Sequence, residues 1–499
     1  MSRLLLTFYG DDFTGSTDAL EQLTLAGIRT ALFIEPPTPK QLGRFKNLQA
    51  VGVAGITRSL PPDVMRRELR PALKNLKALG ARHVHYKVCS TFDSSPTIGS
   101  IGCVIEVAAK VFRAPFIPLL VAAPALGRYT VFGNHFARYG IGSAGAMNRL
   151  DRHPSISKHP VTPMAEADLR VHLARQTTKR IGLFDIFKLG LSPQEARTAL
   201  KRILSEGAEV VLFDALYAEQ MRRIGELIDG YATAKQPLFS VGSSGIEMAL
   251  AAHWQVAAGI LPAVEPGFQP GGTGVDDSGR IESSSDSIGM LASPGGKMPP
   301  STSGRMPDAT KQVLIASGSC SPVTEGQIAW ALQHGFAGVA LDTATLATEK
   351  NIGRVIAQAT ATTVQHLQAG RSVIVHTSRG GHDPRLAATA KLFKRRGLDA
   401  SEAKTVGAII FGSALGAVMR GTLALTHVRR LCIAGGDTSS YAARELGIEA
   451  LEMIAPLTPG APLCRAHATE SPVHELEVVF KGGQVGAEDY FHTVLKGKS

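Results

Sequence analysis

The sequence predicts an α/β protein with two domains and mainly parallel sheets, and three observations lead to that prediction. The chain has 499 residues, too many for a single hydrophobic core. Short apolar runs alternate with amphipathic helical stretches in both halves, which is typical of parallel sheets covered on both faces. Between the halves the pattern gives way to glycine, serine and proline. We therefore expect domains at 1–264 and 311–499, a flexible linker at 265–310, and an active site in the cleft between the domains.

The elements of the first half follow from the apolar pattern. The strand candidates are Leu4–Tyr9, Thr30–Ile34, Ala50–Ala54, His83–Val88, Ile117–Ala122, Ile181–Phe184, Val210–Phe213 and Leu238–Val241. The helix candidates are Ser16–Ala26, Pro62–Leu79, Gly99–Phe112, Ser192–Ser205 and Ala218–Tyr231. Because strands and helices alternate, we expect neighbouring strands to be parallel.

The second half repeats this alternation. Its strand candidates are Gln312–Ala316, Gly338–Leu341, Ser372–Val375, Arg430–Ala434 and Val478–Lys481. Helices are expected at Thr324–Gln333 and Tyr441–Leu446. The most apolar stretch, Val406–Met419, is too short to span a bilayer and is expected to be a buried helix.

Cysteine usage and the N-terminus bear on the cellular setting. The chain has five cysteines, scattered and odd in number, without a C-x-x-C pair. This pattern favours reduced thiols, a cytoplasmic location and no structural zinc or other metal site. The apolar run that starts at Met1 ends at Asp11 and lacks a cleavage site, so no signal peptide is expected.

The charge distribution narrows the choice of partners. The formal net charge is +11, but the basic residues are dispersed and lack interleaved aromatic residues. We therefore expect neither a nucleic-acid nor a membrane partner. A basic balance favours anionic small molecules such as ATP or a sugar acid.

The segment after Arg430–Ala434 indicates a phosphate site. Gly435 and Gly436 let the backbone approach a ligand closely, and Asp437 and Thr438 add polar side chains before the expected helix. Free N–H groups at a helix start are where a phosphate binds. A tight turn without a ligand gives the same pattern, so this segment needs support from elsewhere in the chain.

Two adjacent carboxylates, Asp11 and Asp12, follow the first strand candidate. In an open parallel sheet, ligands bind beyond the carboxyl ends of the strands. These carboxylates can accept hydrogen bonds from sugar hydroxyls, hold Mg²⁺ or remove a hydroxyl proton. In the alternative interpretation, Asp12 and Thr14 only cap the helix that begins near Ser16.

A second polar cluster follows the strand His83–Val88. Lys87 could pair with a substrate carboxylate, while Ser90, Thr91 and Asp93 could contact hydroxyl groups. Alternatively, Lys87 is a solvated charge at a strand end and the serines only form a turn. The density of polar groups favours the functional interpretation.

Two further candidates follow the strand Ile117–Ala122. Arg128 and His135 could line the same cleft. A single histidine is more often structural than catalytic, so His135 is the weaker of the two candidates.

The second half contains two more possible phosphate contacts. Ser317, Ser319 and Ser321 lie in a loop of small residues between a strand and a helix, which is a plausible phosphate cradle. Gly482 and Gly483 follow the last strand. Neither a P-loop nor a G-x-G-x-x-G motif occurs, so a dinucleotide cofactor is not expected.

Taken in order along the chain, these motifs resemble those of the four-carbon acid sugar kinases. The resemblance runs from end to end and excludes only the linker. It is carried by Asp11–Gly15, Pro124–Arg128, His159–Met164, Phe213–Ala215, Val241–Gly245, Gly318–Thr324, Gly435–Ser439, Pro456–Gly460 and Lys481–Gly483. It implies an N-terminal domain that binds the sugar acid, a C-terminal domain that binds ATP, and Mg²⁺ as companion. Ser319, Gly435 to Thr438 and a glycine near Gly482 fall where the family contacts nucleotide.

One departure from the family pattern concerns the substrate. Many members carry Lys-x-Asp-Ser-Thr-Leu-Arg-Gly, whereas this chain has Lys-Val-Cys-Ser-Thr-Phe-Asp-Ser at 87–94. This version resembles the branch that acts on 3-oxo acids, namely 3-oxo-tetronate and 3-oxo-isoapionate kinases. The lost arginine and the gained Asp93 make D-threonate and D-erythronate less expected substrates.

The sequence therefore predicts an ATP-dependent kinase of a small sugar acid in carbohydrate catabolism, most readily a 3-oxo acid. Asp12 is expected to orient or deprotonate the accepting hydroxyl, with Asp11 in reserve, while Lys87 and Arg58 hold the acid. The alternatives are a D-threonate, D-erythronate or glycerate-type kinase, and a sensor without turnover. A homodimer is considered, although the sequence does not give the oligomeric state.

Overall fold

The computed structural model describes residues 4–139, 145–158, 162–257 and 310–497. Within these residues, the strands form one 15-stranded sheet and one three-stranded sheet. Most of the predicted linker, and part of the His159–Met164 motif, lie outside the described residues.

The N-terminal half contains the predicted strands and helices, with ends that shift by at most a few residues. Its strands in the large sheet are β1 (Leu6–Gly10), β2 (Thr30–Phe33), β3 (Ala50–Ala54), β4 (His83–Lys87), β5 (Ile117–Leu120), β9 (Ile181–Phe184), β10 (Val210–Phe213) and β11 (Leu238–Gly242). Its helices are α1 (Phe13–Leu25), α2 (Pro39–Leu42), α3 (Pro62–Ala78), α4 (Ile101–Val111), α5 (Leu169–Ala174), α6 (Ile186–Leu189), α7 (Pro193–Ser205), α8 (Ala218–Asp229) and α9 (Gly245–Ala257).

The C-terminal half also contains the predicted strands. Its strands are β12 (Leu314–Ser317), β13 (Ala337–Ala340), β14 (Val373–His376), β15 (Arg430–Ala434), β16 (Ala450–Thr458), β17 (Ala461–His467) and β18 (Glu477–Lys481). Its helices are α10 (Pro322–Gln333), α11 (Thr343–Ala347), α12 (Ile352–Gln368), α13 (Pro384–Arg395), α14 (Ala400–Leu423), α15 (Gly436–Glu445) and α16 (Tyr490–Lys496).

Besides α14, two helices begin three or more residues before their predicted starts. α1 begins at Phe13 rather than Ser16, because Asp12 caps it by accepting a hydrogen bond from the Gly15 N–H at 2.7 Å. α15 begins at Gly436 rather than Tyr441, so the expected start was wrong. Gly435 adopts φ 126°, a conformation that favours glycine, and the helix forms directly after it.

Two groups of strands were not expected from the sequence. The strands β6 (Arg128–Val131), β7 (Asn134–Arg138) and β8 (Met147–Arg149) form the small antiparallel sheet. The hairpin of β16 and β17 was also missed. β16 contains Pro456 and shifts register against β17, which removes the regular alternation that marks a strand.

The apolar stretch Val406–Met419 is the central part of α14, which is longer than expected. Within the described chain, Glu402–Leu423 of this helix is long and apolar enough to cross a membrane by length and composition, and half of the tested window is buried inside the protein. α14 packs against α12 and α15.

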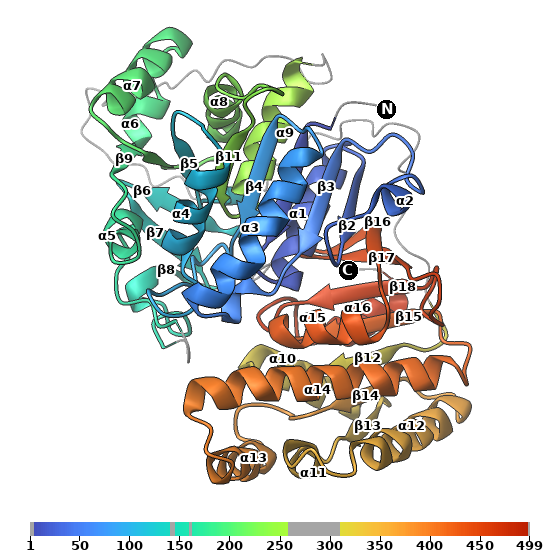
Figure 1. The fold of residues 1–499 in the computed structure, drawn as a ribbon. Helices are drawn as coiled ribbons and strands as arrows, with labels where there is room; N and C mark the ends of the chain where they lie inside the picture. The colour runs from blue at the N-terminus through green and yellow to red at the C-terminus, as the bar shows by residue number, and fades with distance from the viewer. Residues whose placement is uncertain (1–3, 140–144, 159–161, 258–309, 498–499) are drawn as a thin grey trace, which may run out of the picture.

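The large sheet joins the two halves. Its strand order is β13-β14-β12-β15-β18-β17-β16-β2-β3-β1-β4-β11-β5-β10-β9. The neighbours in this sheet are parallel except along the run from β18 through β17 and β16 to β2, where each pairing is antiparallel. Figure 1 shows β16, β17 and β18 between the blue N-terminal half and the C-terminal helices. The predicted α/β class with mainly parallel strands is confirmed, and the sheet is continuous across both halves.

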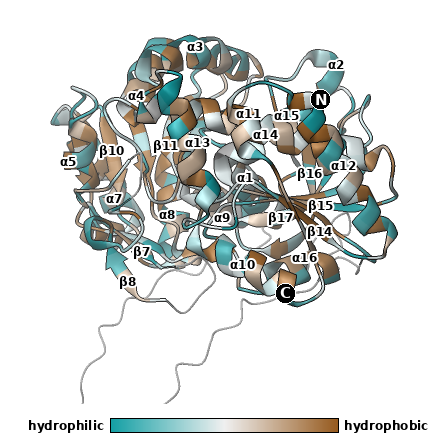
Figure 2. Ribbon diagram, turned by 90° about the horizontal axis from the view of Figure 1, so that it is seen from below, coloured by the Kyte–Doolittle hydropathy of each residue, from teal (hydrophilic) through white to brown (hydrophobic). Residues whose placement is uncertain are grey.

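Helices cover both faces of the sheet, and one apolar core runs through both halves. This core includes residues of α1, α8 and α9 from the first half, and of α12, α14 and α15 from the second. A second core lies under α3 and α4, and a third under α10 and α16. Figure 2 shows the hydrophobic strands enclosed by helices whose outer surfaces are more hydrophilic.

Helix α1 is the element around which the two halves meet. It contacts β2 and β3 of its own half, and β16, β17 and α15 of the other half. Phe13 at its start packs on Phe480 of β18, with ring centroids 4.3 Å apart. The Glu21 carboxylate accepts a hydrogen bond of 2.6 Å from the Gly460 N–H, in the turn between β16 and β17.

The Glu21 contact predicts a pH-dependent stability. Burial raises the pKa of Glu21 from 4.5 to about 8, so folding takes up a proton between these pH values. The free energy of unfolding therefore falls as the pH rises through this range. Glu21→Gln cannot ionise, yet it keeps an acceptor oxygen for Gly460. We expect it to be more stable than the parent by roughly 4 kcal/mol at pH 7.5, with the difference vanishing near pH 4.

Urea unfolding at pH 4, 6 and 7.5 measures this difference. Glu206→Gln is the matched control, because Glu206 forms an exposed pair with Arg202 and its side chain is 60% exposed. The same pH dependence in Glu21→Gln and in the parent would contradict the assignment.

Candidate active site

The two carboxylates after β1 are held together by one arginine. Arg58 lies in the short 3₁₀ turn Thr57–Ser59, directly after β3, which pairs with β1. Its Nη2 is 2.7 Å from Asp11 Oδ1, and its Nη1 is 2.6 Å from Asp12 Oδ2. Burial raises the pKa of Asp11 to about 6, although Arg58 opposes the shift. The cluster therefore places two neighbouring buried carboxyl groups on a single guanidinium.

Asp12 caps α1 and also faces the interior of the site. Its Oδ1 accepts from the Gly15 N–H at 2.7 Å, while its Oδ2 accepts from Arg58 and from the Thr14 hydroxyl at 2.9 Å. Asp12 is thus the cap of α1, whereas Thr14 lies inside the helix and donates to the second oxygen of Asp12. That second oxygen joins the cap to Arg58.

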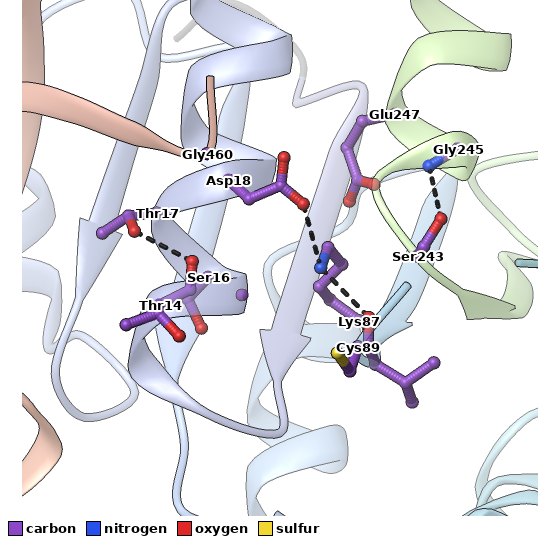
Figure 3. A network of polar contacts seen from close by, with 12 residues as sticks. Thr14, Ser16, Thr17, Asp18, Lys87, Cys89, Ser243, Gly245, Glu247 and Gly460 are labelled. Carbon is purple, nitrogen blue, oxygen red and sulfur yellow. Dashed lines mark hydrogen bonds and ion pairs between the residues drawn. The ribbon is translucent and has the colours of Figure 1, made fainter. Parts of the chain in front are cut away.

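Lys87 lies beneath this cluster, at the end of β4. Its side chain is 1% exposed, and its Nζ is 3.2 Å from Asp18 Oδ2. Figure 3 shows the Lys87 ammonium between Asp18 of α1 and Glu247 of α9. Burial opposes the charge, but Asp18 and Glu247 outweigh it and raise the pKa of Lys87. Lys87 is therefore a charged lysine whose partner is already present in the protein.

Asp18 and Glu247 were not identified from the sequence. Each has one buried oxygen without a hydrogen-bond partner among the described residues, namely Asp18 Oδ1 and Glu247 Oε2. His85 Nδ1 lies 2.8 Å from the other Glu247 oxygen. Asp18 falls inside the helix that was predicted from Ser16 to Ala26. A carboxylate so close to the start of a buried helix was the only signal available.

The loop after β4 brings Ser90, Thr91 and Asp93 together near Arg58. The Thr91 hydroxyl donates to Asp93 Oδ1 at 2.9 Å, and Asp93 raises the pKa of Arg58 together with the closer carboxylates. His135 is buried behind this loop. Its Nε2 lies 2.9 Å from the Ser90 carbonyl oxygen, and its Nδ1 lies 2.8 Å from the Thr130 hydroxyl.

The contacts of His135 fix its protonation. Burial lowers its pKa to about 3, so the ring is neutral, with Nε2–H donating to Ser90 and Nδ1 accepting from Thr130. Both nitrogens are occupied, which suits a residue that holds the Ser90 loop in place.

Arg128 is a buried cation of a different kind. Its Nη1 donates to three carbonyl oxygens, those of Leu126, Gly127 and Arg138. Its Nε has no partner in the described parts of the chain. Burial lowers its pKa, while Cys89 and Asp93 oppose that shift. Unlike Arg58 and Lys87, Arg128 forms no ion pair among these residues.

The predicted nucleotide contacts of the C-terminal half converge at the ends of β12, β15 and β18. Ser317 Oγ is buried and without a partner among the described residues. Ser319 Oγ accepts from the Ser321 N–H at 3.2 Å, and Ser321 caps α10 through the Val323 N–H. Helices α10 and α15 both begin here, and a helix N-terminus favours a bound anion.

The glycines at these strand ends pack closely on the serine loop. A carbon added to Gly483 would lie 3.0 Å from Ser319 Oγ, and one added to Gly318 would lie 2.0 Å from Thr438 Oγ1. Gly435 donates its N–H to the Lys481 carbonyl oxygen at 3.0 Å. The side chain of Asp437 lies outside what the structure describes.

The glycine turns of the C-terminal half and the carboxylates after β1 meet at the start of α1. A carbon added to Gly436 would lie 3.3 Å from Asp12 Oδ2, and one added to Gly482 would lie 3.8 Å from Thr14 Oγ1. The glycine turns of the C-terminal half therefore face the carboxylate cluster of the N-terminal half directly.

Comparison with known proteins also divides the chain into an N-terminal and a C-terminal domain. The profile of a sugar-binding N-terminal domain matches residues 6–250, and that of a nucleotide-binding C-terminal domain matches residues 314–491. A 3-oxo-isoapionate kinase of Paraburkholderia graminis is 39% identical over 99% of this chain and 95% of its own. The chain belongs to the four-carbon acid sugar kinase family.

A second member of this kinase family and one solved structure are similar over the same length. A 3-oxo-tetronate kinase of Methylobacterium radiotolerans is 30% identical, over 99% of each chain. A crystal structure from Salmonella typhimurium LT2 has a TM-score of 0.68 at 22% identity and covers 99% of each chain. The latter shows that the fold is shared.

The close packing around Gly15 predicts a selective loss of activity. A side-chain carbon at Gly15 would lie 2.6 Å from Asp12 Oδ1 and 3.3 Å from Lys87 Nζ. Gly15→Ala should displace the Asp12 carboxylate and lower kcat/KM by about tenfold or more, since an ångström of misplacement at a reacting group is costly. Steady-state kinetics with the acid and MgATP tests this expectation.

Gly353→Ala is the matched control. Gly353 also lies near the start of a helix, α12, but nothing lies within 4 Å of an added carbon. This variant should keep its activity and gain up to about 1 kcal/mol in stability. Equal activity in the two variants would show that Asp12 need not stay in this position.

Proposed function

We propose that the chain is an ATP-dependent kinase that phosphorylates a hydroxyl group of a small 3-oxo sugar acid. The observation that carries this proposal is the approach of Gly436 and Gly482 to Asp12 and Thr14. A phosphate held by the glycine turns would lie beside a carboxylate that can receive a hydroxyl proton. The other glycine and serine contacts predicted for the nucleotide lie on the same side.

The substrate proposed first is 3-oxo-isoapionate. Support comes from the 39% identity to the Paraburkholderia graminis 3-oxo-isoapionate kinase, against 30% to the Methylobacterium radiotolerans 3-oxo-tetronate kinase. The departure at Cys89–Ser94 also favours a 3-oxo acid over D-threonate or D-erythronate.

We assign the carboxylate of the acid to Arg128. Arg58 and Lys87 were predicted for this task, but each already pairs with carboxylates of the protein. Arg128 is buried and has no such partner in the described chain. A guanidinium can bind a carboxylate through two parallel hydrogen bonds. Ser90, Thr91 and Asp93 would then contact the hydroxyl and keto groups.

The reaction follows from this arrangement. The accepting hydroxyl oxygen attacks the γ-phosphorus of ATP, the bond between that phosphorus and the bridging β–γ oxygen breaks, and ADP leaves. The hydroxyl proton passes to Asp12. The rate depends on positioning and on neutralising the phosphate charge, because the protein supplies little covalent chemistry.

Mg²⁺ is proposed as the companion of ATP. Among the described residues, no group of three or more His, Cys, Asp or Glu side chains could hold a metal ion by itself. This donor set fits Mg²⁺ that arrives with the nucleotide, since Mg²⁺ usually takes one or two carboxylates plus phosphates and water. Asp11 is the carboxylate that would hold it, since Asp12 is assigned to the hydroxyl proton, and the ion would offset phosphate charge.

Three predictions from the sequence remain proposals. The domain boundaries at 264 and 311 agree with the matched ranges but need limited proteolysis to test them. A cytoplasmic location is supported by five free cysteines. The homodimer can be checked by the mass of the protein in solution.

The function is tested by ADP release with MgATP and a panel of acids. The panel contains 3-oxo-isoapionate, a 3-oxo-tetronate, D-threonate, D-erythronate and glycerate. We expect the highest kcat/KM with 3-oxo-isoapionate. Preference for D-threonate or D-erythronate would contradict the substrate assignment, and ATP binding without turnover on any acid would contradict the kinase.

The base assignment is tested by Asp12→Asn. Asparagine can still cap α1 but cannot accept a proton, so kcat should fall by about 10²–10⁴-fold. Asp185→Asn is the matched control, because Asp185 caps α6 in the same way and should keep full activity. Near-normal turnover of Asp12→Asn would move the base role to Asp11.

A further inference from the structure

Lys481 is a buried cation with no role in the reaction proposed above. It is the last residue of β18, and its side chain is fully buried. Its Nζ donates to the Thr324 hydroxyl at 3.0 Å and lies 5.5 Å from the centre of the Tyr490 ring.

No carboxylate neutralises Lys481 within the described chain. The groups that face its ammonium are Thr324 of α10, Tyr490 of α16 and Cys432 of β15. Burial raises the pKa of the Cys432 thiol to about 12, so the thiol is neutral. An unpaired buried charge is costly, and burial accordingly lowers the pKa of Lys481 to about 8.

Lys481 is bonded to both glycine turns of the nucleotide side. Its carbonyl oxygen accepts the Gly435 N–H at 3.0 Å. Its ammonium reaches the other turn through Thr324, whose hydroxyl donates to the Gly483 carbonyl oxygen at 3.1 Å. Gly483 in turn packs on Ser319 and Ser321. A single residue thus connects the turns that approach Asp12 with the serine loop.

We propose that Lys481 is a positioning residue for ATP, and that its ammonium is the counter-charge beneath the loops that hold the triphosphate. This inference rests on the proposed function. The unpaired charge is unfavourable in the free protein and becomes compensated when the polyanion binds above it. Neutralising the Lys481 charge therefore contributes to the binding free energy of ATP.

Lys481→Met separates this role from a structural one. If the charge serves the nucleotide, removing it should leave the melting temperature of the free protein unchanged or higher. The stabilisation by MgATP should shrink, KM for MgATP should rise at least tenfold, and KM for the acid should stay within twofold. A lower melting temperature with an unchanged KM for MgATP would overturn the proposal. Lys179→Met is the control, since Lys179 pairs with Glu209 at the surface.

Proton uptake gives a second readout that packing alone would not change. At pH 8 about half of Lys481 is deprotonated in the free protein, and bound ATP should restore its proton. Calorimetric titration with MgATP in two buffers of different ionisation enthalpy measures this uptake. We expect uptake in the parent and less in Lys481→Met. Equal uptake in both would contradict the proposal.

Thr324→Val tests the connection if Lys481→Met does not fold. It removes the hydroxyl that joins Lys481 to Gly483 and keeps the side-chain shape, so KM for MgATP should rise, while Thr324→Ser should restore it. Unchanged KM in Thr324→Val would exclude the connection. If the parent protein binds ATP with proton uptake but phosphorylates no acid, the kinase proposal fails and the role of Lys481 in binding stands.

Discussion

Strand β16 pairs with β2 across the junction of the two halves, and the approach of the C-terminal glycine turns to the N-terminal carboxylates depends on this pairing. Because three antiparallel steps separate β18 from β2, the parallel strands of the two halves run in opposite directions. In a flat sheet their carboxyl ends would lie at opposite edges. The sheet instead twists and wraps around α1, so the ends of β1, β15 and β18 meet at the N-terminus of that helix.

The cationic side chains on the two sides of this junction differ in whether a carboxylate pairs with them. On the sugar-acid side, Arg58 and Lys87 are each matched by carboxylates, so their charges hold the site together. On the nucleotide side, the proposed contacts are glycine N–H groups, serine hydroxyls and helix N-termini, with Lys481 buried behind them. Phosphoryl transfer needs a place where a polyanion can sit beside a carboxylate base without strong repulsion. The ion pair with Arg58 would provide that condition at Asp12, the proposed base.

Much of this arrangement could be predicted from the sequence, because buried strands have a strong apolar signal. Ala50–Ala54 was predicted with both ends correct. The polar residues after the strands were selected as site candidates from the sequence, but the pairing of Arg58 with Asp11 and Asp12 was not predicted. Contacts that depend on tertiary packing could not be predicted. Asp18 meets Lys87 only through the fold, and the β16–β17 hairpin, which joins the halves, is hidden by a proline and a register shift.

The most direct test of the account is a structure of the protein with a non-hydrolysable ATP analogue, Mg²⁺ and the preferred acid. The account predicts that the γ-phosphate lies at the start of α15, between Gly436 and the Asp12 carboxylate, with the acid's carboxylate on Arg128. A nucleotide bound away from Gly435–Thr438, or an acid whose hydroxyl groups are remote from Asp11 and Asp12, would contradict it.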